Sequence, residues 1–281
     1  MKVLYMSAVA GADYLDNMVM HGMRSLLGAD LVDVNKQWFM YQGANPPFHS
    51  IYALLPDIPV DRENILEKIR SHYFDRIVYG SIQRCYTYID EVIRVYPKQH
   101  IALIDGEDGD GLSSALHLGQ YFKREIYNAA AEPSLIPISF SIPKEKIIDA
   151  LPPKTCLFAH CDPRDRSTYI YYGENGEANY YYQYSESYFG YTMKKGGWDC
   201  CRHYEILAAG ALPYFADIES CPPLTLAFFP RAELLHAREM ADHWGDHQML
   251  PYEGLLYHMR TILREKLTTE AMARYVLERL Q

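Results

Sequence analysis

One segment constrains the fold more than any other: residues 195–219, which read KGGWDCCRHYEILAAGALPYFADIE. An apolar helical pattern runs from about residue 200 to 209 and stops at Gly210, and Pro213 follows shortly after. Glycine just past a helix with proline soon after is a common helix stop. The apolar residues that follow predict a short buried strand that ends in acids. The segment is therefore a loop, a helix, a tight turn and a strand in succession.

The start of this helix has the residues of a phosphate site. Gly196 and Gly197 would let a ligand reach the free N–H groups of the first turn, and the helix dipole favours an anion there. Arg202 could hold a diphosphate through two parallel hydrogen bonds, and Glu205, three residues on, could accept hydrogen bonds from two ribose hydroxyls. Lys195 is a further phosphate candidate. The pattern suits a nucleotide-sugar, and an exposed arginine–glutamate pair on a helix is the plainer alternative.

Strand and helix patterns alternate along the rest of the chain. The predicted strands lie at residues 2–8, 31–34, 76–80, 100–104, 155–160 and 224–229. The predicted helices lie at residues 14–27, 62–72 (capped by Asp61), 86–96, 232–243, 252–263 and 268–280. Prolines at 133, 137 and 143 mark a linker between two such halves. This order predicts an α/β protein with two facing Rossmann-like domains and a cleft between them.

Acidic residues follow the first predicted strand, at the edge where open α/β sheets bind ligands. Asp13 has two interpretations: it could cap the helix that starts at Tyr14, or it could act as a general base toward a hydroxyl acceptor. Asp16 and His21 are weaker candidates for the same cleft, because they lie further into the helix.

A second acidic loop, DGEDGDG at residues 105–111, follows the strand predicted at 100–104. It resembles the start of a calcium-binding loop, but the twelfth position, where such a loop has its bidentate glutamate, is Leu116. Calcium is therefore disfavoured. We expect Asp105 and Glu107 to face the same cleft as Asp13, because this loop also lies at the carboxyl end of a strand.

Two adjacent cations, Lys123 and Arg124, come next. If they lie beside the cleft, they could meet the diphosphate of the donor. The alternative is a solvated ion pair with Glu125.

The run GWDCCRHYEILAAGALP resembles the donor-binding segment of GT-B glycosyltransferases, in particular of the exostosin-like and CgeB-like group. Glu205 matches the glutamate of that group that binds the ribose, and Gly210 and Pro213 match its turn. The stretches DYLDNMVMHGMRSLLG and DGEDGDG…YFKRE…PISFSIP are also similar to this group. One position departs from it: many retaining members carry a second glutamate eight residues before the first, and Gly197 stands there. The departure favours an inverting mechanism.

The resemblance implies a GT-B-like architecture. Residues 1–140 would bind the acceptor, residues 141–281 would bind the nucleotide-sugar, and the last helix would return to the first domain. The implied activity is transfer of a sugar from a nucleotide-sugar, with UDP as the expected nucleotide, to a hydroxyl of a glycan or similar acceptor. Asp13 would be the base. We expect no metal and no other cofactor, because Asp108-Gly109-Asp110, which fits the D-x-D string, lies in the acceptor domain.

Composition narrows the partners and the location. The net charge is −9, so we expect no nucleic-acid partner, and no apolar run is long enough to span a bilayer. The six cysteines form no C-x-x-C pair, which is typical of buried free thiols in a cytoplasmic protein. Two rivals remain: a catalytically inactive glycan-binding protein of the same fold, and a nucleotide-dependent oxidoreductase or epimerase. The second would need G-x-G-x-x-G after the first strand, where the chain reads AVAGA.

Overall fold

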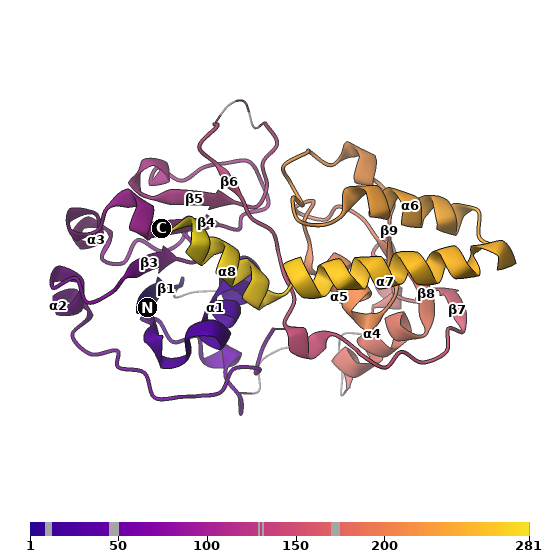
Figure 1. The fold of residues 1–281 in the computed structure, drawn as a ribbon, viewed down its shortest axis with the longest axis horizontal. Coiled ribbons are helices and arrows are strands. Elements are labelled where there is room, and N and C mark those ends of the chain that lie inside the picture. The colour runs from indigo at the N-terminus through magenta and orange to yellow at the C-terminus, as the bar shows by residue number, and fades with distance from the viewer. Residues whose placement is uncertain (9–12, 45–50, 129, 131, 170–174, 281) are drawn as a thin grey trace.

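The computed structural model describes residues 1–8, 13–44, 51–128, 130, 132–169 and 175–280. Its two sheets are both parallel, and they lie side by side along the long axis of the molecule (Figure 1). The predicted α/β class is confirmed, with one sheet in each half of the chain.

The larger sheet belongs to the N-terminal half and has the strand order β2-β1-β3-β4-β5-β6. Its strands are β1 Val3–Met6, β2 Leu31–Asp33, β3 Arg76–Tyr79, β4 Ile101–Asp105, β5 Gln120–Lys123 and β6 Ile136–Pro137. Strands β5 and β6 were missed in the sequence, because the charged residues at the end of β5 obscure its apolar core.

Alternating side chains divide this sheet into two buried faces. Val3 and Tyr5 of β1 belong to one apolar cluster, while Leu4 and Met6 belong to the other. Helices α1 (Tyr14–Leu27) and α8 (Thr269–Arg279) cover the first face. Helices α2 (Ile65–Arg70) and α3 (Ile89–Val95) cover the second. Helix α2 is shorter than predicted: Asn64 occupies its N-cap position, and Asp61 pairs with Lys68 instead.

The smaller sheet belongs to the C-terminal half and has the order β7-β8-β9. Its strands are β7 Cys156–Phe158, β8 Ser187–Thr192 and β9 Leu212–Phe215. Its helices are α4 Gly176–Ser185, α5 Cys201–Ala209, α6 Arg231–Asp242 and α7 Met249–Lys266. The strand predicted at residues 224–229 is wrong: that segment consists of turns, with Thr225 hydrogen-bonded to Ile126 of the N-terminal half.

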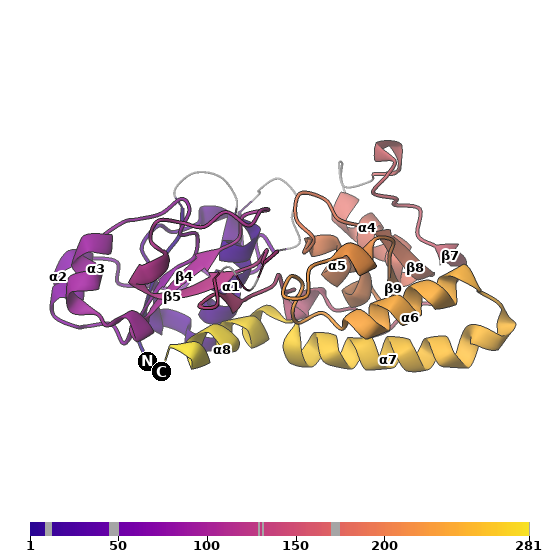
Figure 2. The ribbon, with the colours of Figure 1, turned by 90° about the horizontal axis from the view of Figure 1, so that it is seen from above.

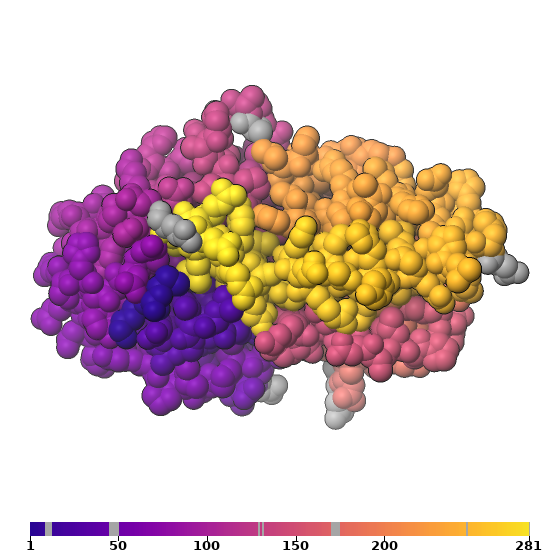
Figure 3. Space-filling model, in the orientation of Figure 1, coloured from indigo at the N-terminus to yellow at the C-terminus, as the bar shows by residue number. Residues whose placement is uncertain are grey.

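The C-terminal end of the chain packs against the N-terminal half. Helices α7 and α8 follow one another along one side of the molecule, and α8 packs against α1 (Figures 1 and 2). The space-filling view shows these two helices as a continuous strip across both halves (Figure 3). A β-bridge between Ile142 and Thr268 ties the linker to the start of α8.

Gly22 makes the close contact between α1 and α8 possible. A Cβ atom at this position would lie 1.9 Å from the backbone oxygen of Thr269. We expect Gly22→Ala to lower the free energy of unfolding by about 2 kcal/mol, since backbone cannot yield as a flexible side chain can. Gly254→Ala is the matched control: this exposed glycine of α7 has nothing within 4 Å of its added Cβ. The control should gain roughly 0.5–1 kcal/mol in urea denaturation, and a stabilised Gly22→Ala would contradict the contact.

Candidate functional site

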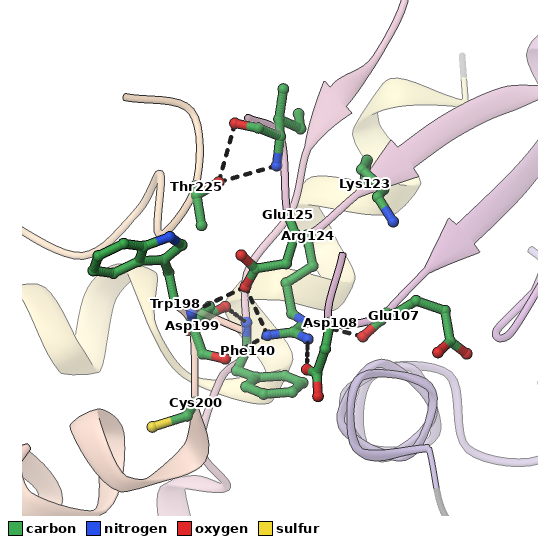
Figure 4. A network of polar contacts seen from close by, with 12 residues as sticks. Glu107, Asp108, Lys123, Arg124, Glu125, Phe140, Trp198, Asp199, Cys200 and Thr225 are labelled. Carbon is green, nitrogen blue, oxygen red and sulfur yellow. Dashed lines mark hydrogen bonds and ion pairs between the residues drawn. The ribbon is translucent and has the colours of Figure 1, made fainter. Parts of the chain in front are cut away.

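The carboxyl ends of strands from both sheets meet between the two halves. Arg124 and Glu125 follow β5, Asp108 follows β4, and the turn at residues 196–199 follows β8. Figure 4 shows the side chains of Arg124 and Glu125 reaching the backbone around Asp199 across the boundary, with Asp108 beside Arg124. In open α/β sheets this edge is where ligands bind. The boundary is therefore the place to examine for a site.

Arg124 lies at the centre of this boundary and is fully buried. Its guanidinium donates to Glu125 Oε1 at 2.9 Å, to the Gly106 carbonyl at 3.0 Å, to Asp108 Oδ1 and to the carbonyl of Asp199. The predicted role of Arg124 as a diphosphate ligand does not fit this conformation, because protein oxygens use its donors. The alternative was a solvated ion pair with Glu125. The ion pair is confirmed, but it is buried and not solvated.

The predicted role of Lys123 as a diphosphate ligand does not fit the structure either. Its ammonium is fully buried and lies 3.0 Å from Asp105 Oδ1. The same carboxylate accepts from Tyr121 at 2.5 Å and from Gln83 at 2.9 Å. Asp105 is itself fully buried, so neither it nor Lys123 faces a cleft. Both side chains form a buried ion pair at the carboxyl ends of β4 and β5.

Asp199 completes the buried network from the other side. Its carboxylate accepts from the Phe140 N–H at 2.6 Å and from the Tyr204 hydroxyl at 2.9 Å. Burial raises the pKa of Asp199, while the charge of Arg124 opposes that rise. The sequence analysis did not single out Asp199, although an acid directly before a helix is a recognisable signal.

The two glycines of the turn touch carboxylates of the N-terminal half. A Cβ on Gly196 would lie 2.0 Å from Asp108 Oδ2, and one on Gly197 would lie 2.4 Å from Glu125 Oε1. They permit close approach, as expected, but what approaches here is protein. Lys195 remains exposed, and its ammonium lies 5.7 Å from the ring centre of Tyr169.

Glu205 and Arg202 lie on α5, each only 5% exposed. Glu205 Oε2 accepts from the hydroxyl of Tyr180, on α4, at 2.8 Å. Tyr180 was missed in the sequence, where it is one of many tyrosines in a row. Glu205 also lines a cavity of about 10 Å³ between the halves, with residues of α1, of the segment between β2 and α2, of the linker and of α5: Met18, Ile51, Ser141, Ile142, Pro143 and Cys201. The carboxylate is thus buried, but at the boundary and not inside one half.

Two carboxylates lie near the start of α1 in the N-terminal half, and both are buried, so Asp16 does not face a cleft as expected. Asp13 caps α1, accepting from the Asp16 N–H at 3.2 Å, and its other oxygen accepts from the Ser81 hydroxyl at 2.7 Å. Asp16 accepts from the Ser7 hydroxyl at 2.9 Å and is 1% exposed. Burial, together with the charge of Asp13, raises the pKa of Asp16 to about 7. The cap interpretation of Asp13 is confirmed, and its role as a base stays a prediction.

The raised pKa of Asp16 makes stability depend on pH. Because the folded protein binds this proton more tightly than the unfolded chain, the contribution of Asp16 is fully present below about pH 4 and is lost as the pH rises through about 7. We expect Asp16→Asn to exceed the wild type by about 2 kcal/mol at pH 8, since relaxation of the surroundings relieves part of the cost, and to match it near pH 4. Denaturation at both pH values tests this, with Asp30→Asn as control because that side chain is half-exposed. Equal gains for Asp16→Asn at both pH values would contradict the prediction.

The other two residues that were expected to face the cleft differ from each other. Glu107 is part-exposed and pairs with Arg84 at 2.7 Å. The prediction that His21 faces the cleft is wrong. Its side chain is 1% exposed and its Nδ1 lies 2.9 Å from Thr269 Oγ1, in the contact between α1 and α8. Burial lowers its pKa, so it is a neutral packing residue away from the cleft.

Comparisons with known proteins give a likeness of shape alone. No model of a protein family matches the chain, and no curated protein sequence matches it. Similar solved structures include an alpha-glucosyltransferase in complex with UDP and a 13-mer DNA containing an HMU base, with a TM-score of 0.48 and 9% identity over 100% of this chain and 99% of that chain. Another is an alpha-glucosyltransferase in complex with UDP, with a TM-score of 0.49, 9% identity and the same coverage. We base no conclusion about activity on likeness at this level.

The expectation that excluded nucleic acid is corrected by the first of these structures. A protein of similar shape occurs in complex with DNA as well as UDP. An overall charge of −9 is therefore no ground for excluding nucleic acid, because binding depends on local charge.

Two features are absent from the described part of the chain. It contains no group of three or more histidine, cysteine, aspartate or glutamate side chains placed to hold a metal ion. Among the described helices, none combines the length and apolar character needed to cross a bilayer.

Proposed function

We propose that the protein transfers a sugar from a nucleotide-sugar to a hydroxyl acceptor. The observation that carries the proposal is the position of Glu205. It lies on the helix that follows β8, at a boundary where the carboxyl ends of two parallel sheets face each other. This is the arrangement expected of a GT-B glycosyltransferase, with residues 1–140 for the acceptor and residues 141–281 for the donor.

Glu205 would bind the ribose of the donor. Tyr180 holds one carboxylate oxygen at 2.8 Å, which fixes the orientation of the group before the ligand arrives. The N–H groups of the turn at Gly196 and Gly197, together with Lys195 and Arg202, would stabilise the charge that develops on the leaving diphosphate. We propose that this needs no metal ion.

Asp13 would act on the acceptor. In an inverting displacement it takes the proton of the acceptor hydroxyl while that oxygen bonds to the anomeric carbon. The bond from the anomeric carbon to the diphosphate breaks, and its electron pair leaves with the nucleotide. The hydrogen bond from Ser81 orients Asp13 for this step.

The two halves must separate for a donor to enter. The cavity beside Glu205 holds about 10 Å³, which is about the space of one water molecule. Small contacts between domains commonly permit such motion.

A thermal-shift screen with a panel of nucleotide-sugars, with and without EDTA, tests the proposal. A bound donor raises the midpoint by mass action, and an undiminished shift in EDTA supports metal independence. Transfer is then measured by mass spectrometry on two acceptors: a glycan mixture and a DNA duplex with hydroxymethylated bases. Binding of sugar without transfer or donor hydrolysis would favour the inactive glycan-binding protein, and no shift with any nucleotide-sugar would refute the proposal.

A further inference from the structure

The anion site at the start of α5 already holds an anion from the protein itself. Glu125 Oε1 accepts from the backbone N–H of Asp199 at 3.0 Å, directly ahead of the helix (Figure 4). Gly197 approaches so closely that a Cβ there would lie 2.4 Å from this oxygen. The Glu125 carboxylate thus takes the N–H of Asp199 and lies near the positive end of the α5 dipole, where a phosphate would also be attracted.

A second carboxylate lies against the neighbouring glycine. Asp108 Oδ2 would be 2.0 Å from a Cβ on Gly196, and Asp108 Oδ1 accepts from Arg124. Arg124 thus donates hydrogen bonds to both carboxylates that flank the turn, and the distance from its Nη1 to Glu125 Oε1 is 2.9 Å. Two protein anions and one protein cation therefore lie where the proposed diphosphate would bind.

The arrangement is suited to two alternative states. Glu125 and Arg124 are fully buried, and the Arg124 guanidinium lies 4.5 Å from the ring centre of Phe140. A buried carboxylate and an entering diphosphate repel each other, so they cannot share the turn. Either Glu125 holds the Asp199 N–H and the halves stay joined, or the diphosphate takes its place and Glu125 moves away.

We propose that Glu125 is a built-in competitor of the donor diphosphate, and that the conformation described here is the self-occupied form of the site. Donor binding releases Glu125 from the turn and frees Arg124 to pair with the phosphates. This inference rests on the proposed function, whose donor it places in competition with a named side chain.

Affinity measurements on Glu125→Ala test it. Only molecules with an open site bind, so the apparent affinity equals the intrinsic affinity multiplied by the open fraction. Removing the competitor should therefore tighten the binding of UDP and of inorganic pyrophosphate by about tenfold. Isothermal titration calorimetry of both ligands against the wild type, Glu125→Ala and Glu219→Ala gives the comparison. Glu219 also pairs with an arginine, Arg238, but its side chain is 60% exposed and outside the network. The control should bind both ligands as the wild type does.

The outcomes separate this inference from the proposed function. If Glu125→Ala binds pyrophosphate more tightly than the wild type does, while neither protein binds UDP, the role of Glu125 as a competitor is supported and the nucleotide-sugar donor is refuted. If a folded Glu125→Ala binds UDP as tightly as the wild type does, or more weakly, the role of Glu125 as a competitor is refuted, while the proposal of a nucleotide donor is retained. Should Glu125→Ala fail to fold, Glu125→Gln decides the question. It keeps the shape and an acceptor for Asp199 but removes the charge, and it should tighten both ligands in the same direction; no tightening refutes the competitor.

Discussion

Replacing Arg124 by methionine should lower the free energy of unfolding by about 3–5 kcal/mol, the usual cost of removing one partner from a buried ionic network. The fully buried guanidinium neutralises Glu125 and Asp108 and donates to the carbonyl of Asp199 (Figure 4). Methionine keeps an unbranched apolar side chain but removes the guanidinium that lies over the Phe140 ring, and it leaves the carboxylates without their cation. Because these groups come from both halves, the contact between the halves should weaken most.

Guanidinium chloride denaturation, followed by tryptophan fluorescence and far-UV circular dichroism, measures the loss. Trp198 is 8% exposed and lies in the turn of the network, so its emission reports the separation of the halves. Arg70→Met is the matched control. It removes an exposed pair with Glu91 at 3.0 Å and should cost less than about 1 kcal/mol. A loss for Arg124→Met no larger than that of the control would show that the network contributes little to stability.

Glu205→Gln should weaken the binding of UDP by about 100-fold, or about 2.7 kcal/mol, because hydrogen bonds to a charged group are among the stronger ones. The amide loses both the charge and one acceptor for the ribose hydroxyls. The sharper readout compares UDP with its 2′,3′-dideoxy analogue. The wild type should prefer UDP, and Glu205→Gln should bind both alike, since the discriminating contact is gone.

Matched variants separate ribose binding from other effects. Glu233→Gln, on α6, changes a partly exposed carboxylate that lies 3.3 Å from His258, outside the proposed site, and should leave both affinities unchanged. Tyr180→Phe should show a smaller loss than Glu205→Gln, because it frees the carboxylate without removing it. Asp13→Asn should reduce turnover while UDP affinity stays the same. A Glu205→Gln protein that still prefers UDP over the dideoxy analogue would remove Glu205 from the ribose site.

Local patterns in the sequence were sufficient for many of the elements. The apolar runs at β1, β3 and β4, and helix α1 with its start after Asp13 and its end at Gly28, were predicted closely. Each depends on neighbours within a few residues, through side-chain periodicity and capping. The predictions failed where a short pattern had two solutions: residues 224–229 read as a strand but form turns, and β5 was hidden by its charged end.

The sequence by itself determined the α/β class, the loop, helix and strand around α5, and which residues carry charge near the ends of the strands. Only the tertiary structure decided which charges pair. Lys123 and Arg124 were expected to face a ligand, but the first is buried against Asp105 and the second reaches Asp199, 75 residues further along the chain. Periodicity encodes which face of an element is buried, because that depends on near neighbours. The partner of a buried charge depends on how two distant sheets bring their loops together, and no local pattern records that.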